Sequence, residues 1–494
     1  MTGTRNAHTP SVERSWESKQ KPFRTRVHVY RYIVSQLQLS LFSVSCAKPH
    51  ERFFDHRESR IEYRVAKKTS YLYHIMCRDD AEDPRDCSND RAWMLEPTTA
   101  NNGTGSLTED GVEFIARHKY KPGHYTHLDN FMNPFWTWIT DLLPLTIAPN
   151  MVTTMGGFHC LLSYMVIWKY SPNMDAACPD WVVFLAGYCT LAYYTLDCMD
   201  GKQARRTQTS SPLGQLFDHG IDCLSNLAHI STFASYTMIG GTKWILLMQT
   251  NLQVSFFMAQ WEEYYTHILP HAMGNWFGVT EVNYGNGVIT MLNAFVDREV
   301  IYTKTLSEHL PKALVEVLPP VVASLELRHA ITCGLLFGNV ILITGSLHRV
   351  FTHENVRKNG GYLMALSKLF TPVLIAIIPF CLPTHIMESE CRLISIGAGL
   401  LFSFLTKKII VFSMAKMSFA SFQLEALPYV LLLLWIRFDS RITPRGVHTL
   451  LAMLCVWNGF RLVNWARVAI HQICVRLDIF CFTIKRKRTD VKKD

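Results

Sequence analysis

The chain has 494 residues, of which 49% are hydrophobic and 18% are charged, and its formal net charge is +9. A nucleic-acid-binding protein would cluster its basic residues on a soluble fold. Here they lie mainly in the N-terminal extension, in short loops and in the C-terminal tail, which excludes nucleic acid as the expected partner and favours anionic lipid. The 14 cysteines include no C-x-x-C pair, so we expect buried thiols rather than a disulfide framework.

The N-terminal part of the sequence is polar. Its first 27 residues have no apolar core, so we expect no cleavable signal peptide. Residues 28–45 are mildly apolar and free of acids, which leaves an amphipathic or targeting helix as an alternative to disorder. Residues 96–108 have the composition of a linker. We predict a polar, poorly ordered extension over 1–110, a membrane domain over 111–475 and a basic cytosolic tail over 476–494.

Apolar runs recur after residue 135, and several approach the roughly 20 residues that a helix needs to cross a bilayer. They predict an all-α polytopic membrane protein with about ten transmembrane helices. Before the first run, the Trp-rich residues 133–147 predict a helix that lies in the membrane interface. The ten segments lie near 151–171, 181–199, 222–240, 243–263, 285–297 (which is short), 329–349, 362–386, 392–415, 424–438 and 448–472.

The basic residues of the loops predict the orientation of these segments. The loop over 171–180 has no Lys or Arg, as the non-cytosolic side should. We therefore place both termini and the 200–213 loop in the cytosol. The loop after the fifth segment departs from this pattern, because it carries Arg298, Lys304, Lys312 and Arg328. The cytosolic assignment depends on Lys202, Arg205 and Arg206, on Arg349, Arg357 and Lys358, and on Lys485, Arg486, Lys487 and Arg488.

Four carboxylates stand at the ends of two apolar segments. Asp197 and Asp200 are three residues apart, and Asp218 and Asp222 are four apart, so each pair shares one face of a helix. If the faces converge, the carboxylates repel one another unless a divalent cation, or two, binds between them. All-oxygen ligands favour Mg²⁺ or Mn²⁺. The alternative is an ordinary loop network in which these acids pair with Lys202, Arg205 and Arg206.

The spacing D-x2-D-G-x2-A-R-x8-G-x3-D-x3-D resembles the signature of the CDP-alcohol phosphotransferase family. The surrounding residues are similar to its eukaryotic choline/ethanolamine phosphotransferase branch, over about 110–475 of this chain. Matching stretches also include Ala148-Pro149-Asn150, Trp261-Glu262-Glu263-Tyr264 and Gly278-Val279-Thr280-Glu281. The signature itself is matched without a gap by Asp197, Asp200, Gly201, Ala204, Arg205, Gly214, Asp218 and Asp222.

This resemblance implies a homodimer of ten-helix subunits whose site opens to the cytosol and to the bilayer. It implies two Mg²⁺ (or Mn²⁺) ions, held by Asp197, Asp200, Asp218 and Asp222. His219 is implied as the general base, with Asp222 as the other candidate. The implied substrate-binding residues are Asn150, Tyr193, Gly201, Ala204, Arg205, Gly214 and Gln215.

The implied reaction transfers phosphocholine or phosphoethanolamine from CDP-choline or CDP-ethanolamine to diacylglycerol, giving phosphatidylcholine or phosphatidylethanolamine and CMP. The implied location is the endoplasmic reticulum, with the Golgi as an alternative. Many relatives carry Glu where this chain has Gln215, and Lys407 replaces a neutral polar residue, so the choice between choline and ethanolamine stays open. Aromatic residues that could cage a trimethylammonium group include Tyr193, Tyr194, Trp261 and Tyr264.

Three other interpretations of the carboxylates remain. A transporter with a carboxylate-lined path would not need the signature frame, and the sequence shows no inverted repeat. A catalytically dead relative would have lost metal ligands, and none is lost. A related transferase with inositol, glycerol phosphate or serine as acceptor fits the eukaryotic-type context less well.

Overall fold

The structure is a computed structural model that describes residues 107–118, 123–358 and 361–485. All of them belong to one compact unit, Ser70–Asp494. Residues 1–106 of the predicted extension, including the alternative helix over 28–45, lie outside the described residues, as does the tail after residue 485. Described structure begins at the buried Leu107, which is followed at once by a helix.

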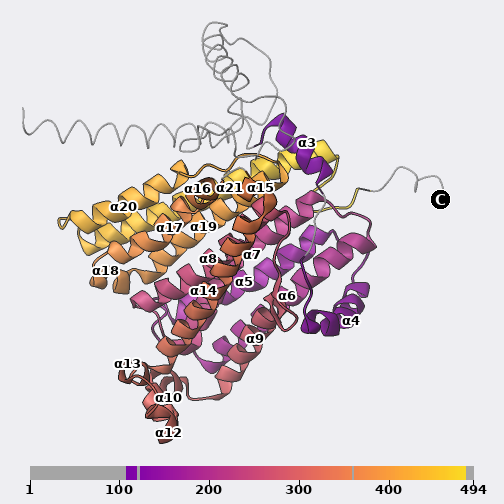
Figure 1. The fold of residues 1–494 in the computed structure, drawn as a ribbon. Helices are drawn as coiled ribbons and strands as arrows, with labels where there is room; N and C mark the ends of the chain where they lie inside the picture. The colour runs from indigo at the N-terminus through magenta and orange to yellow at the C-terminus, as the bar shows by residue number, and fades with distance from the viewer. Residues whose placement is uncertain (1–106, 119–122, 359–360, 486–494) are drawn as a thin grey trace, which may run out of the picture. The chain divides into compact units, whose positions relative to one another are not determined.

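The described residues are predominantly helical (Figure 1). One short antiparallel pair of strands, β1 (Ala272–Met273) and β2 (Phe277–Gly278), forms a hairpin. The long helices are α4 (His127–Asp141), α5 (Pro149–Tyr170), α6 (Asp180–Arg206), α7 (Pro212–Thr237), α8 (Lys243–Thr266), α9 (Val279–Leu292), α14 (Leu327–Thr352), α19 (Cys391–Met414), α20 (Leu427–Phe438) and α21 (Pro444–Leu477). The shorter ones are α3 (Glu109–Arg117), η1 (Asn293–Phe295), α10 (Arg298–Thr303), α11 (Leu306–His309), α12 (Lys312–Val315), α13 (Pro320–Ala323), α15 (Glu354–Lys358), α16 (Tyr362–Ser367), α17 (Phe370–Ile377), η2 (Ile378–Cys381), α18 (Thr384–Ser389) and η3 (Leu424–Ala426).

The predicted all-α, polytopic membrane fold is confirmed. Six helical stretches in the described part are long and apolar enough to cross a membrane, namely α5, α6, α14, Tyr362–Cys381, α19 and α21. Each of the ten predicted segments coincides with helical residues. However, α9 has 14 residues and α20 has 12, or about 21 and 18 Å at 1.5 Å per residue, less than the roughly 30 Å of a bilayer core. Ten complete crossings therefore stay a prediction.

The helix predicted over 133–147 is present with different bounds. Its start at His127 follows from a capping box, in which Thr126 and Asp129 bond to each other's backbone N–H groups. It ends at Asp141, because Leu142 and Leu143 donate to carbonyls three residues back instead of four; Pro144, which has no N–H, follows. Large apolar side chains on it are exposed, as an interfacial helix requires: Phe131, Phe135 and Trp138.

Small residues and paired charges hold the bundle together. A Cβ at Gly187 of α6 would lie 2.7 Å from the carbonyl oxygen of Gly287 on α9, so this crossing depends on glycine. The central helix α19 packs against α7, α8 and α21 and is buried on nearly every face. Its buried Lys408 donates to Gln423 at 2.7 Å and to Glu425 at 3.0 Å, so the cation has both a hydrogen-bond acceptor and a countercharge.

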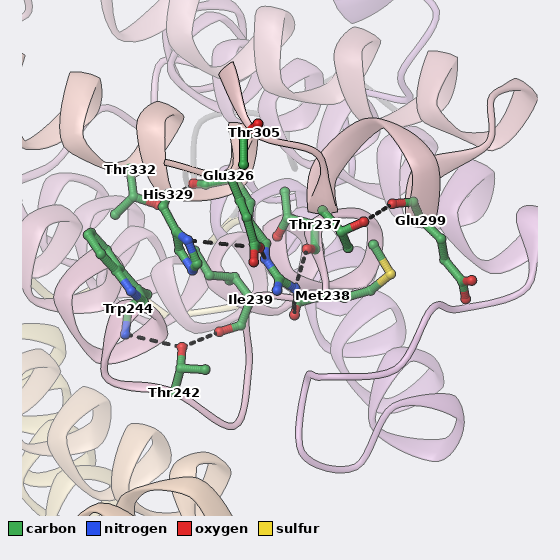
Figure 2. Close-up of polar contacts among 12 residues, drawn as sticks. Thr237, Met238, Ile239, Thr242, Trp244, Glu299, Thr305, Glu326, His329 and Thr332 are labelled. Atoms are coloured by element: carbon green, nitrogen blue, oxygen red, sulfur yellow. Dashed lines mark hydrogen bonds and ion pairs between the residues drawn. The ribbon is translucent and has the colours of Figure 1, made fainter. Parts of the chain in front are cut away.

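The two arginines that broke the loop-charge pattern have protein partners. Arg328 donates to the carbonyl oxygen of Met238, just beyond the end of α7, at 2.7 Å and pairs with Glu326 at 2.6 Å. Figure 2 shows this end of the fold, where the ring of His329 stacks on Trp244 at 4.6 Å. The buried Arg298 pairs with Asp180 at 2.7 Å. Because each arginine is paired with an acidic residue, its presence in this loop does not indicate that the loop lies on the cytosolic side.

Candidate active site

The antiparallel helices α6 and α7 bring three predicted metal ligands together. Asp197 and Asp200 lie near the end of α6, and Asp218 lies in the second turn of α7. One carboxylate oxygen from each lies within 4.8 Å of the others. Pro212 is the first residue of α7, a position where its missing N–H is tolerated.

Asp222 lies one helical turn beyond Asp218 and has a different environment. Its Oδ1 accepts a hydrogen bond from the hydroxyl of Tyr193 at 2.5 Å, and Tyr193 in turn accepts one from Ser225 at 3.1 Å. Asp222 interacts with Asp197, but its oxygens do not belong to the group of three. The structure thus places Asp222 beside the cluster, and its role as a metal ligand stays a prediction.

The cluster fits a divalent cation. Asp197 Oδ1 and Asp218 Oδ1 are both buried and accept no hydrogen bond within the part of the chain that the structure describes. Oxygens of this kind are the ligands that a hard cation prefers, and such an ion would offset the repulsion among the carboxylates. The site therefore has the donor set, the spacing and the burial that a metal ion requires.

The alternative of a loop network is wrong for the described side chains. Lys202 donates instead to Asn133 and Thr137 of α4. Arg206 donates to the backbone carbonyl of Leu143 at 2.6 Å. Arg205 is exposed and its charge acts on the nearby Asp200, but no hydrogen bond or ion pair joins its guanidinium to a described residue.

Three residues of the signature segment form what we call the latch: Lys202, Gln203 and Arg206. They bind α4 and the turn that connects it to α5. The buried Gln203 donates to the carbonyl oxygens of Pro144 at 3.1 Å and Ile147 at 3.0 Å. The sequence analysis did not predict these contacts of the latch. The residues that the latch binds lie more than 50 residues away in the sequence and belong to no recognisable motif. The latch fixes the start of α5 relative to the carboxylates on α6.

Helix α5 supplies a site residue that the sequence analysis missed. Thr153 donates from its hydroxyl to Asp200 Oδ2 at 2.5 Å and thereby orients that carboxylate. Thr153 lies three residues after Asn150, on the same face of the helix. This spacing is the signal that could have identified it, because Asn150 was already implied as a substrate-binding residue.

His219 is buried beside the cluster. Its Nε2 lies 3.8 Å from Asp218 Oδ2, longer than a hydrogen bond but within reach of a small movement. The ring therefore presents Nε2 on the side of the carboxylates. Lys407 packs against the next residue of α7, because a Cβ at Gly220 would lie 3.3 Å from Lys407 Cε.

The other expected substrate residues differ in their environments. A Cβ at Gly214 would meet nothing within 4 Å, and one at Gly201 would meet only Arg205, at 3.7 Å, so both glycines border open space. Ala204, three residues after Gly201 on α6, is half-buried. Gln215 is bonded on both sides, to His118 at 3.0 Å and to Glu263 at 3.1 Å. Asn150 donates to the carbonyl oxygen of Cys481 at 2.9 Å.

The aromatic residues considered for a trimethylammonium cage do not all converge. The indole N–H of Trp261 donates to the carbonyl of Ala365 at 3.0 Å, and the hydroxyl of Tyr264 donates to the carbonyl of Met417 at 3.1 Å. Tyr193 is the one of the four that directly contacts a signature carboxylate, through its bond to Asp222.

Together, the fold and the carboxylate cluster define a polytopic membrane protein with a buried acidic site suited to a divalent cation. A family model described as CDP-alcohol phosphatidyltransferase matches residues 146–278, which include the whole cluster. The chain belongs to this family, so the resemblance inferred from the signature is confirmed, as is the expected class of transferase.

Named relatives cover most of the chain. Choline/ethanolaminephosphotransferase 2 of Arabidopsis thaliana is 30% identical over 78% of this chain and 99% of its own length. Choline/ethanolaminephosphotransferase 1 of Saccharomyces cerevisiae is 24% identical over 77% and 98%. Ethanolaminephosphotransferase 1 of Mus musculus is 26% identical over 75% and 93%.

Proposed function

We propose that this protein transfers phosphocholine or phosphoethanolamine from a CDP-alcohol to diacylglycerol and releases CMP. The observation that carries the proposal is the convergence of Asp197, Asp200 and Asp218, with oxygens within 4.8 Å of one another, on the signature helices. The names of the relatives support both the phosphoalcohol and the class of reaction. Mg²⁺ or Mn²⁺ is the proposed cofactor, and two ions are expected if Asp222 also binds.

The chain's own residues account for the binding of the CDP-alcohol. When bound, the cations would neutralise charge on the pyrophosphate and on the departing CMP. Arg205, exposed beside the cluster, offers a fork of N–H donors to phosphate oxygens. The open space at Gly201 and Gly214 lets the substrate approach the backbone there.

His219 is the proposed general base. Its Nε2, which lies on the side of the carboxylates, takes the proton from the diacylglycerol hydroxyl. The hydroxyl oxygen then forms a bond to the β-phosphorus, the bond from that phosphorus to the bridging oxygen breaks, and CMP leaves with the bridging oxygen. Asp218, 3.8 Å from Nε2, stabilises the imidazolium that results.

The position of the site suits substrates from two phases. The cluster lies near the end of α6 and the start of α7, where a nucleotide can arrive from water and a lipid hydroxyl from the bilayer. We place this end in the cytosol, because the loop between the two helices carries the basic residues expected there. A homodimer in the endoplasmic reticulum, or alternatively the Golgi, completes the proposal.

The experiment is an assay of purified protein with diacylglycerol and either CDP-choline or CDP-ethanolamine, and phospholipid formation is the readout. We expect turnover with at least one donor, and losses of several orders of magnitude in Asp197→Asn and Asp218→Asn. Asp110→Asn, on the exposed face of α3, is the matched control and should be unchanged. Transport of an ion with no phospholipid formation would overturn the proposal.

A further inference from the structure

The end of the described chain folds back toward the site. Helix α21 ends at Leu477, and Asp478 adopts a left-handed conformation with φ of 52°, which reverses the chain. The segment that follows, residues 479–485, is called the strap here. Lys485 pairs with Asp478 at 2.5 Å, so a salt bridge joins the last residue of the strap to the turn at its start.

The strap contacts α7, which carries Asp218, and the residues just before α5. Thr483 pairs through its backbone with Ile147, just before α5, as an isolated antiparallel bridge. The ring of Phe482 packs edge-on against Phe217 of α7, with centroids 5.5 Å apart. Because Phe217 directly precedes Asp218, this contact lies one residue from the metal cluster.

The strap also determines how Asn150 is oriented. Asn150 is 7% exposed, and its Nδ2 donates to the carbonyl oxygen of Cys481 at 2.9 Å. A carbonyl oxygen can only accept, so the amide nitrogen of Asn150 must face the strap. Nδ2 also donates to Cys481 Sγ at 3.7 Å, so the group left for a ligand is the amide oxygen, which accepts. One turn further along α5, Thr153 bonds to Asp200, so this face of α5 leads directly to the cluster.

We propose that the strap is a positioning element for the CDP-alcohol, acting through Asn150. By holding the amide nitrogen, it presents the amide oxygen to a donor on the nucleoside, such as the amine of cytosine or a ribose hydroxyl. An unheld amide would rotate between two orientations, and only one of them would suit the substrate. This inference deepens the proposed function and rests on it.

Two truncations of the full chain separate the strap from the basic tail. A stop after Asp478 removes the strap, and a stop after Lys485 keeps it and removes only the tail. We expect the first to raise the KM for CDP-choline about threefold to tenfold, the effect of losing one neutral hydrogen bond, with kcat within about twofold. The second should leave both unchanged. Asn150→Ala should raise KM similarly, and its combination with the first truncation should add little more, because both act through the same bond.

A milder variant covers the case in which the shorter truncation fails to fold. Phe482→Ala should also raise the KM for CDP-choline, by a smaller factor than the truncation. Phe482→Trp keeps an aromatic contact to Phe217 and should have the KM of the native protein. An unchanged KM in Phe482→Ala and in the strap truncation, or effects that add fully to Asn150→Ala, would overturn the inference. A fall in KM would also overturn it, because the strap would then block the site.

Failure of the proposed function is a separate result. In that case the full-length protein makes no phospholipid from either CDP-alcohol. Calorimetric titration of the same variants with CMP, which carries the nucleoside half, still tests the strap. Weaker CMP binding without the strap supports the inference, and equal binding contradicts it.

Discussion

Arg206 provides a quantitative test of the latch. Its guanidinium donates to the carbonyl oxygens of Leu143 at 2.6 Å, Asp141 at 3.0 Å and Thr140 at 3.3 Å. Hydrogen bonds from charged groups contribute about 1.5–3 kcal/mol each, but this side chain is 28% exposed, so water replaces part of each bond. At about 1 kcal/mol per bond, Arg206→Ala should destabilise the protein by about 3 kcal/mol. Arg206→Lys keeps the charge but cannot reach all three carbonyls, and should cost about 1–2 kcal/mol.

The functional consequence follows from geometry. The latch holds the turn before Asn150 against α6, and a displacement of about 1 Å in such an arrangement can cost about a hundredfold in rate. We expect kcat/KM for CDP-alcohol to fall about tenfold to a hundredfold in Arg206→Ala and less than tenfold in Arg206→Lys. The assays are thermal unfolding in detergent and steady-state kinetics, with the exposed Arg467→Ala as control. If Arg206→Ala kept the melting temperature and kinetics of the control, the latch would have no role.

Three further predictions concern the base, the core and the extension. His219→Ala should abolish turnover and keep CDP-alcohol and Mg²⁺ binding by calorimetry, whereas Asp222→Ala should lose metal affinity as well; near-normal turnover in His219→Ala would return the role of base to Asp222 or to water. Lys408→Met leaves the carboxylate of Glu425 buried and should destabilise the protein by about 3–5 kcal/mol in thermal unfolding, and adding Glu425→Leu should recover most of that loss; a double variant as unstable as the single one would refute this. Deletion of residues 1–105 should leave the specific activity of correctly inserted protein within a few-fold, and a complete loss would reveal a functional element there.

The convergence of the carboxylates could be predicted because local spacing determines it. Residues three or four apart on a helix share a face, and a short loop between α6 and α7 forces the two helices to lie antiparallel. The sequence therefore indicated that the four carboxylates could converge, and the structure groups three of them, Asp197, Asp200 and Asp218, with Asp222 beside them. The apolar runs likewise coincide with helices, because hydrophobic length is a direct requirement of the bilayer.

Contacts between distant residues could not be predicted in this way. The partners Asn150 and Cys481 are 331 residues apart, and no periodicity links them. The aromatic side chains of Trp261 and Tyr264 were plausible cage residues by composition, yet their polar atoms bond to carbonyls of other elements. The bounds of α4 depended on a capping box at Thr126, which was not considered.

Dependence on a divalent cation tests the central claim most directly. The account predicts that exhaustive chelation with EDTA abolishes phospholipid formation by the purified protein, and that Mg²⁺ or Mn²⁺ restores it. Calorimetric titration with Mg²⁺ alone should show binding to the native protein and none to Asp218→Asn, because Asp218 Oδ1 is one of the two buried oxygens without a hydrogen bond in the described cluster. Full activity after chelation, or equal Mg²⁺ binding by Asp218→Asn, would contradict the assignment of this cluster as the metal site.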